Sequence, residues 1–288
     1  MFGPDSITWK IDREMALFLG GPRAVLLQIA HPAVAAAVER HSSFRTDPLG
    51  RLSRTLDSVF QIVFGDADEA KAAAARVARR HAPVRGTIDE KSASPWSGRP
   101  YHAQDPELML WVHATLVDTA LFVFRAVVRD LERSEAERYY EESKAVAELI
   151  GIPRSVLPAT LADFDAYFAG IVDGPTLHVG AVARTQCEDL TRLQPSYALR
   201  SIYGDERMKR WSRVVDVGPL HRRYASLTRV LAAGMLPPRL RAEYGYEWRR
   251  RDRLAYESVL ASARVAVRVL PPRLRFLPGY EARARSFG

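Results

Sequence analysis

Histidine is the residue type in this sequence best placed to do chemistry. Seven histidines occur, and four of them fall on or at the ends of expected helices in the first half of the chain: His31, His41, His81 and His113. Carboxylates at helical spacing from them are scarce, which argues against a di-iron site of the Glu-x-x-His kind. The sequence also lacks HExxH, GxSxG, Walker A and GxGxxG motifs. The chemistry left open is that of imidazole as a ligand or proton carrier.

The stretch 108–124, LMLWVHATLVDTALFVF, is predicted to be the central helix that positions His113. No proline or glycine interrupts it, and Asp105-Pro106-Glu107 supplies an N-cap, an N1 proline and a first-turn acid. Apolar residues lie all round the helix, so we expect it to be buried on every side. At 3.6 residues per turn its polar residues Thr115, Asp118 and Thr119 form one stripe, and His113 lies on the apolar side.

Two interpretations of His113 stay open at this point. A core histidine would hydrogen-bond to a backbone carbonyl group, as buried polar groups usually do. Alternatively, His113 is a ligand to a metal or haem, because small neighbours such as Ala114 and Ala120 suit a flat macrocycle.

His81 is the second candidate. It ends an alanine-rich helix that begins near Glu69, and it lies on the small-residue face with Ala70, Ala74 and Ala78. It is therefore expected on a buried face near the C-terminal end, where the helix dipole tolerates a cationic imidazole. The competing interpretation is a residue that caps the helix.

Four arginines are candidates for binding an anionic group. A helix expected from Asp47-Pro48 to about Phe64 places Arg51 and Arg54 on one side, and Arg80 is next to His81. The Gly-Gly-Pro-Arg junction that ends at Arg23 would suit a phosphate or propionate at a helix N-terminus, although a tight helix–helix corner explains its glycines equally well. The alternative for Arg51, Arg54 and Arg80 is that they are ordinary surface charges.

Composition limits the class of protein. Among 288 residues, 47% are hydrophobic and 26% charged, as in soluble globular proteins. The single cysteine, Cys187, excludes an internal disulfide and a cysteine-rich metal site. No export signal is visible, so a cytoplasmic location is expected. The stretch 108–124 is just long enough to span a membrane, but its central His and Asp favour a core helix, so we expect no integral membrane segment.

The net charge of +8 comes mostly from the C-terminal fifth, where residues 236–288 hold twelve arginines and five acidic residues. No nucleic-acid recognition motif accompanies them, so no nucleic-acid partner is expected. The hexapeptide LPPRLR occurs at 236–241 and again at 270–275, which suggests two helix corners around a helix at 252–269. We expect that helix to pack through its apolar residues, Leu254, Val259, Val265 and Val269.

No segment shows sustained period-two alternation, so the fold is predicted to be all-α. We expect one domain, 1–288, around a central buried helix at about 108–128, with a basic helical C-terminal extension from about 236. Residues 84–101 have the composition of an irregular loop. Trp96 in its middle is interpreted either as an anchor to the surface or as a lid over a substrate channel.

Several blocks of residues carry a resemblance. GGPRAVLLQIAHP (20–32), HSSFRTDP (41–48), RLSRT (51–55), HAPVRG (81–86), YHAQDPEL (101–108) and LWVHATLVD (110–118) occur in that order. Together, up to about residue 240, they resemble the catalytic domain shared by the latex-clearing rubber oxygenases and the MpaB-type oxygenases.

The resemblance implies an all-helical protein that binds haem b, with His113 as the proximal iron ligand by its Leu-x-x-His-Ala context. The rubber oxygenases supply the distal side from an earlier helix bearing Arg, Lys and Thr, whereas the corresponding region here, Arg79-Arg80-His81, departs from that pattern.

From the resemblance we expect a haem-dependent oxygenase that acts with dioxygen on a small apolar substrate. His81 would be a distal ligand or acid/base, and Arg51, Arg54, Arg80 and Arg23 would bind propionate groups or orient oxygen. The alternatives are a bis-histidine haem protein without catalysis, which uses His113 and His81, and a helical protein without a cofactor.

Overall fold

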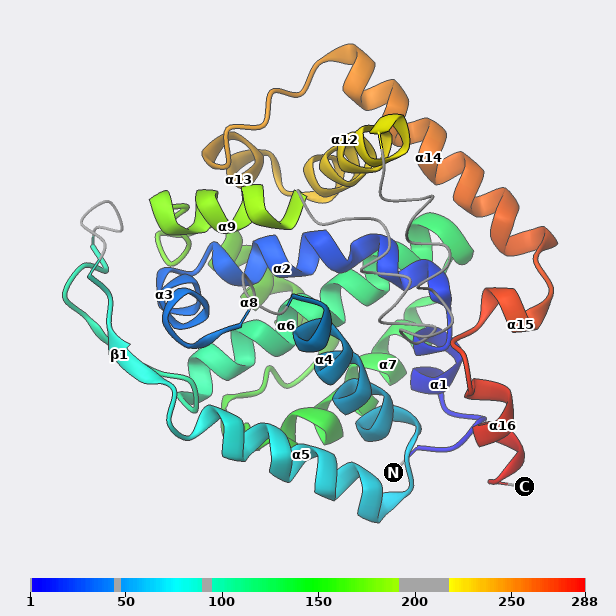
Figure 1. Ribbon diagram of the computed structural model, residues 1–288. Helices are drawn as coiled ribbons and strands as arrows, with labels where there is room; N and C mark the ends of the chain where they lie inside the picture. The colour runs from blue at the N-terminus through cyan, green and yellow to red at the C-terminus, as the bar shows by residue number, and fades with distance from the viewer. Residues whose placement is uncertain (1, 44–47, 90–94, 192–217, 288) are drawn as a thin grey trace.

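The protein is mostly helical (72%), as predicted. The computed structural model describes residues 2–43, 48–89, 95–191 and 218–287 (Figure 1). The elements before the central helix are α1 (Ile7–Asp12), the 3-10 helix η1 (Met15–Gly20), α2 (Gly21–Ile29), α3 (Pro32–His41), α4 (Pro48–Phe64), α5 (Ala67–His81), β1 (Arg85–Thr87) and β2 (Pro100–His102). The remaining elements are α6 (Pro106–Val123), the π turn η3 (Phe124–Val128), α7 (Arg133–Leu149), the 3-10 turn η4 (Arg154–Val156), α8 (Leu161–Asp173), α9 (Ala181–Thr191), α12 (Gly218–Met235), α13 (Pro238–Glu243), α14 (Arg250–Val269), α15 (Pro272–Arg275) and α16 (Tyr280–Arg285).

Helix α6 and its continuation η3 form the centre of the fold (Figure 1). Asp105 caps α6 by accepting from the Glu107 and Leu108 main-chain N–H groups, as its sequence predicted. Helix α2, η1 and α7 pack against it. The long buried helix expected at about 108–128 is therefore confirmed. The expectation that it is buried on every side is wrong, because Leu116 is 46% exposed.

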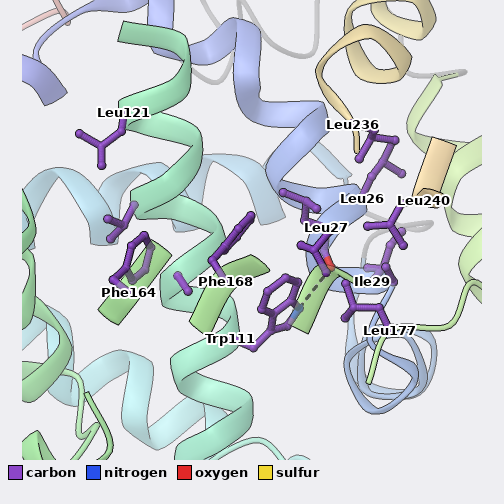
Figure 2. Packing of buried hydrophobic residues seen from close by; sticks show 14 of the residues in the cluster. Leu26, Leu27, Ile29, Trp111, Leu121, Phe164, Phe168, Leu177, Leu236 and Leu240 are labelled. Carbon is purple, nitrogen blue, oxygen red and sulfur yellow. Dashed lines mark hydrogen bonds between the residues drawn. The ribbon is translucent and has the colours of Figure 1, made fainter. Parts of the chain in front are cut away.

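The main hydrophobic core lies where α6 meets α2, α8 and the chain before α13. Figure 2 shows Trp111 stacking on Phe168, with ring centroids 5.5 Å apart, while its indole Nε1 donates to the Leu27 carbonyl oxygen at 3.2 Å. Leu26 and Leu27 of α2 are fully buried beside it. The core thus fixes one face of α6 against α2.

We expected the connection between α5 and α6 to be an irregular loop, but part of it is regular. Strands β1 and β2 pair antiparallel, with Arg85 opposite His102 and Gly86 opposite Tyr101. A Cβ at Gly86 would lie 2.8 Å from the Tyr101 hydroxyl oxygen, so glycine is needed where the strands meet. Each strand has only three residues, which is too short for alternation to be visible in the sequence.

Some helix bounds also differ from the expectation. Apolar spacing in residues 7–19 predicts one helix, but the structure splits this stretch into α1 and η1. The sequence of residues 176–184 is ambiguous between strand and helix, and it becomes regular only from Ala181, where α9 begins. The sequence also predicts a helix at 211–233, broken or kinked at Gly218-Pro219; the structure describes α12 from Gly218, and residues 211–217 lie outside the described part.

The C-terminal segment folds back onto the N-terminal segment. Glu14 forms a β-bridge with Phe276, and its carboxylate pairs with Arg275 at 2.7 Å. Trp9, fully buried, packs edge-on against Phe64 and Tyr280. The first and last helices therefore share a small aromatic core separate from the main one.

The expectation about the inward face of α14 was wrong. Leu254, Val265 and Val269 are 54%, 58% and 71% exposed, whereas Leu260 and Val267 are the buried residues of this helix. Apolar spacing correctly indicated an amphipathic helix. Of the four residues expected to pack, Val259 is partly buried and packs against the Leu260 and Val267 cluster, but the other three were wrongly assigned to the core.

One stretch of the described chain, Pro106–Val128, is long and apolar enough to cross a membrane by length and composition. Most of it (61%) is buried inside the protein, which is also the property of a core helix.

Candidate functional site

His113 occupies the middle of α6 on the side away from α2. The α2-facing residues of α6 are held by polar contacts, including Gln28 Nε2 donating to Thr115 Oγ1 at 3.0 Å. Trp111 also contacts α2, through its hydrogen bond to the Leu27 carbonyl oxygen. His113 is two residues further along α6, so it lies about 200° around the helix axis from Trp111. Because α2 fixes the rotation of α6, it also fixes the direction of the His113 side chain.

The His113 ring is a neutral imidazole with one nitrogen unused. The side chain is 8% exposed, and burial lowers its pKa to about 4, although a hydrogen bond with the Ser143 main chain opposes part of the shift. Nε2 is buried and has no hydrogen-bond partner within the part of the chain that the structure describes. When one ring nitrogen is engaged with the backbone, the other presents its lone pair, which is the form of histidine that binds metals.

Next to His113, part of the α6 surface is uncovered. Leu116, in the middle of the central helix, is 46% exposed, and Met109, Val112 and Ala120 on the same side are half-buried. A core helix with every face packed would bury these residues. The half-covered apolar side, called here the α6 strip, is the kind of surface that an apolar ligand or a flat macrocycle would cover.

Arg51 and Arg54 lie one turn apart on α4. Arg54 donates to Ser43 Oγ at 3.3 Å. Burial lowers the pKa of Arg51, and the charge of Arg54 lowers it further. Two neighbouring guanidinium groups, one of them largely removed from water, favour the binding of a carboxylate or another anion.

His81 is the last residue of α5, and its Nδ1 is buried without a partner among the described residues. Burial lowers its pKa, so the ring is neutral at pH 7. The end of α5 meets the segment before α6, where Gln104 donates to the Ala78 carbonyl oxygen at 3.3 Å. His113 is seven residues beyond the start of α6, about 10 Å along the axis at 1.5 Å per residue. The structure thus places His81 near the N-terminal end of α6 and His113 about two turns further along the helix.

Comparison with known proteins identifies the family of the chain. Residues 9–270 match the model of the family described as ER-bound oxygenase mpaB/B'/rubber oxygenase, catalytic domain. The chain belongs to this family.

Two relatives are similar at lower coverage. They are the uncharacterized protein Mb2261 of Mycobacterium bovis and the uncharacterized protein Rv2237 of Mycobacterium tuberculosis, each 24% identical over 194 residues. The alignment covers 65% of this chain and 66%, just under two thirds, of each relative. No solved structure shows significant similarity. The family resemblance is confirmed, and it extends to residue 270, beyond the expected limit of about 240.

Within this member of the mpaB/rubber oxygenase family, Arg23 is engaged inside the protein. Its Nε donates to the Met235 carbonyl oxygen at 3.0 Å and its Nη1 to Thr119 Oγ1 at 2.5 Å, while Nη2 pairs with Asp118 at 2.5 Å. A Cβ at the neighbouring Gly20 would lie 2.5 Å from the Thr119 side chain, so the glycine permits a tight helix–helix corner. These contacts give Arg23 a structural role, and we leave it out of the proposed site.

Other predicted residues lie at the surface. Arg80 is exposed near the end of α5. His41 is also exposed, with its Nε2 3.2 Å from the Arg85 carbonyl oxygen. Two surface hollows lie beside α7 and α8, where Arg133, Leu161 and Ala162 line both. Neither hollow includes a predicted site residue.

The sequence analysis missed Ser143, whose main chain contacts the His113 ring. Ser143 is buried, and its hydroxyl donates to the Tyr140 carbonyl oxygen at 2.6 Å. No motif marks it, because a main-chain contact can be made by any residue type. Only the packing of α7 against α6 identifies the residue that orients the imidazole.

Proposed function

We propose that this protein is a haem-b-dependent oxygenase that uses dioxygen on a small apolar substrate, with His113 as the proximal iron ligand. The observation that carries the proposal is the buried, unpartnered Nε2 of a neutral imidazole on the central helix. A buried polar atom without a partner is costly in a structural role, and an iron ligand would satisfy it. Family membership supplies the oxygenase class.

The remaining residues fit the same group. The α6 strip offers an apolar surface beside His113, and Arg51 with Arg54 would supply positive charge for propionates. When bound, haem b supplies the redox chemistry needed to use dioxygen. The chain itself orients His113 through the Ser143 main chain, keeps the ring neutral by burial, and excludes water from Nε2.

A second candidate is a bis-histidine haem protein without an open iron position. It is favoured by one observation, the buried and unpartnered Nδ1 of His81. Carbon monoxide distinguishes the two proposals, because it binds a reduced haem with an open position and changes its absorption spectrum. It binds slowly or not at all when two histidines occupy both axial positions.

The test is a haem-binding titration of the full chain followed by optical absorption. His113→Gly should lose the Soret band while circular dichroism shows unchanged helix content, and added imidazole should restore the band by filling the vacated ligand position. His41→Ala is the control, because His41 is exposed and the contacts found for its ring are the Arg85 carbonyl oxygen and the edge of the Tyr101 ring, which do not involve His113. Undiminished haem binding by folded His113→Gly without imidazole would contradict the proposal.

A further inference from the structure

Helix α14 presents an apolar surface to solvent. Nine large hydrophobic residues are exposed in the described part of the chain, and five of them lie on α14, on the residue after it or on α15. These five are Leu254, Val265, Val269, Leu270 and Leu274. Single exposed leucines are ordinary at protein surfaces, but a contiguous apolar group marks an interaction surface.

The exposed residues form one face because the opposite face of α14 is packed. Leu260 and Val267 are buried against α12 and η3. At 100° per residue, Leu254, Ala261 and Val265 lie within about 40° of one another on the outward side. All three are exposed, and α14 runs along the outer edge of the molecule (Figure 1).

The apolar face continues past the end of the helix. Residues 268–274, RVLPPRL, are exposed without exception, and Val269 at 71% is the most exposed of the large hydrophobic residues. Pro271 and Pro272 turn the chain out of α14. We call Leu254, Ala261 and Val265 together with residues 268–274 the outer strip.

Positive charge flanks the outer strip. Residues 250–274 contain six arginines and two acidic residues, a net charge of +4. Four of the arginines are exposed and form no ion pair in the described part of the chain: Arg250, Arg253, Arg268 and Arg273. Apolar side chains at the centre of a helix face with arginines at its margins are typical of helices that lie in the plane of an anionic membrane surface.

We propose that the outer strip docks this protein onto an anionic phospholipid surface. Guanidinium groups would pair with lipid phosphates while Val265, Val269 and Leu270 enter the boundary of the acyl chains. Charge complementarity decides among partners. A second copy of the chain would bring like-charged arginines together, and a nucleic acid would leave the exposed valines and leucines in water. The proposal does not depend on the haem or on the reaction.

The test is co-flotation of the full chain with vesicles of phosphatidylcholine alone or with phosphatidylserine added. We expect binding to the anionic vesicles, weakened by high salt. Arg268→Gln with Arg273→Gln should reduce partitioning about 25-fold, since each arginine near such a surface contributes about fivefold. Val265→Ser with Val269→Ser should reduce it about tenfold. Val59→Ser is the control, because Val59 is also an exposed valine on a helix, α4, but it is not part of the outer strip.

Three results would overturn the proposal. Equal partitioning to neutral and anionic vesicles would remove the role of the arginines. Undiminished binding by both double variants would place the membrane contact elsewhere. A stable dimer in light scattering, abolished by the valine substitutions, would identify the outer strip as a contact between copies. All substituted residues are exposed, so the substitutions should not disturb the fold. Circular dichroism of each variant checks that its helix content is unchanged.

Discussion

The buried contact between Arg23 and Asp118 should be one of the strongest single couplings in the protein. The Arg23 side chain is 5% exposed and that of Asp118 is 25% exposed, and the two groups join α2 to α6. Burial raises the pKa of Asp118, while the Arg23 charge opposes part of that rise. The perturbation is a double-mutant cycle with Asp118→Ala, Arg23→Met and the combined variant.

The structure sets the size of each step. Asp118→Ala leaves a buried guanidinium that still has the Met235 and Thr119 oxygens, so the loss in unfolding free energy should be about 3 kcal/mol, the low end for a broken buried pair. Arg23→Met leaves a carboxylate that water reaches, and should cost about 2 kcal/mol. The combined variant has no buried charge to compensate, so its loss should be about 3 kcal/mol, which gives a coupling of about 2 kcal/mol.

Urea unfolding followed by circular dichroism measures all four proteins. The matched control is the cycle on Arg133 and Glu137, an exposed pair on α7 whose coupling should not be measurable. Additivity of the two single losses within about 0.5 kcal/mol would refute the reasoning. Arg23→Met should also keep the Soret band of the haem-loaded protein. Loss of that band in the folded variant would instead support the original prediction that Arg23 binds a propionate.

Three further predictions follow from the contacts already described. His81→Ala should keep bound haem but change the rate of carbon monoxide binding, and an unchanged rate would make His81 a capping residue. Trp96, whose ring lies 4.8 Å from that of His31, should act as an anchor, so Trp96→Ala should increase hydrogen exchange in the hairpin without changing carbon monoxide association; faster association would support the lid. Burial raises the pKa of Asp12 to about 7 from 3.8, so between these values the folded state holds a proton that the unfolded state has released. Stability should therefore fall by about 4 kcal/mol as pH rises from about 4 to 7, and Asp12→Asn should remove most of that fall in pH-dependent urea unfolding.

Features that depend on helical periodicity could be predicted from the sequence. The start of α6 follows from its capping residues, and the orientation of His113 away from Thr115 and Asp118 follows from 3.6 residues per turn. The unpartnered state of Nε2 could not be predicted, because it depends on which groups α7 brings to the ring.

Contacts between distant segments gave no signal in the sequence. The carbonyl oxygen that accepts from Arg23 belongs to Met235, 212 residues away, and a backbone acceptor carries no residue preference. Periodicity showed that α14 is amphipathic, but both of its faces carry valine and leucine. Only packing against α12 and η3 decides that Leu260 and Val267 are buried while Leu254 and Val265 are not.

The aromatic core around Trp9 has a consequence for synthesis of the chain. The residues that form this core come from both ends of the chain. Beside Trp9, Arg13 donates a hydrogen bond to the hydroxyl of Tyr280, 267 residues later in the sequence. At about 5–20 residues per second, a ribosome needs roughly 13 to 50 s to add that length. Throughout this interval the indole of Trp9 lacks the side chain that covers it in the finished protein. The N-terminal segment therefore keeps exposed apolar surface until the final helices are synthesised, which makes it a binding site for chaperones that act on nascent chains.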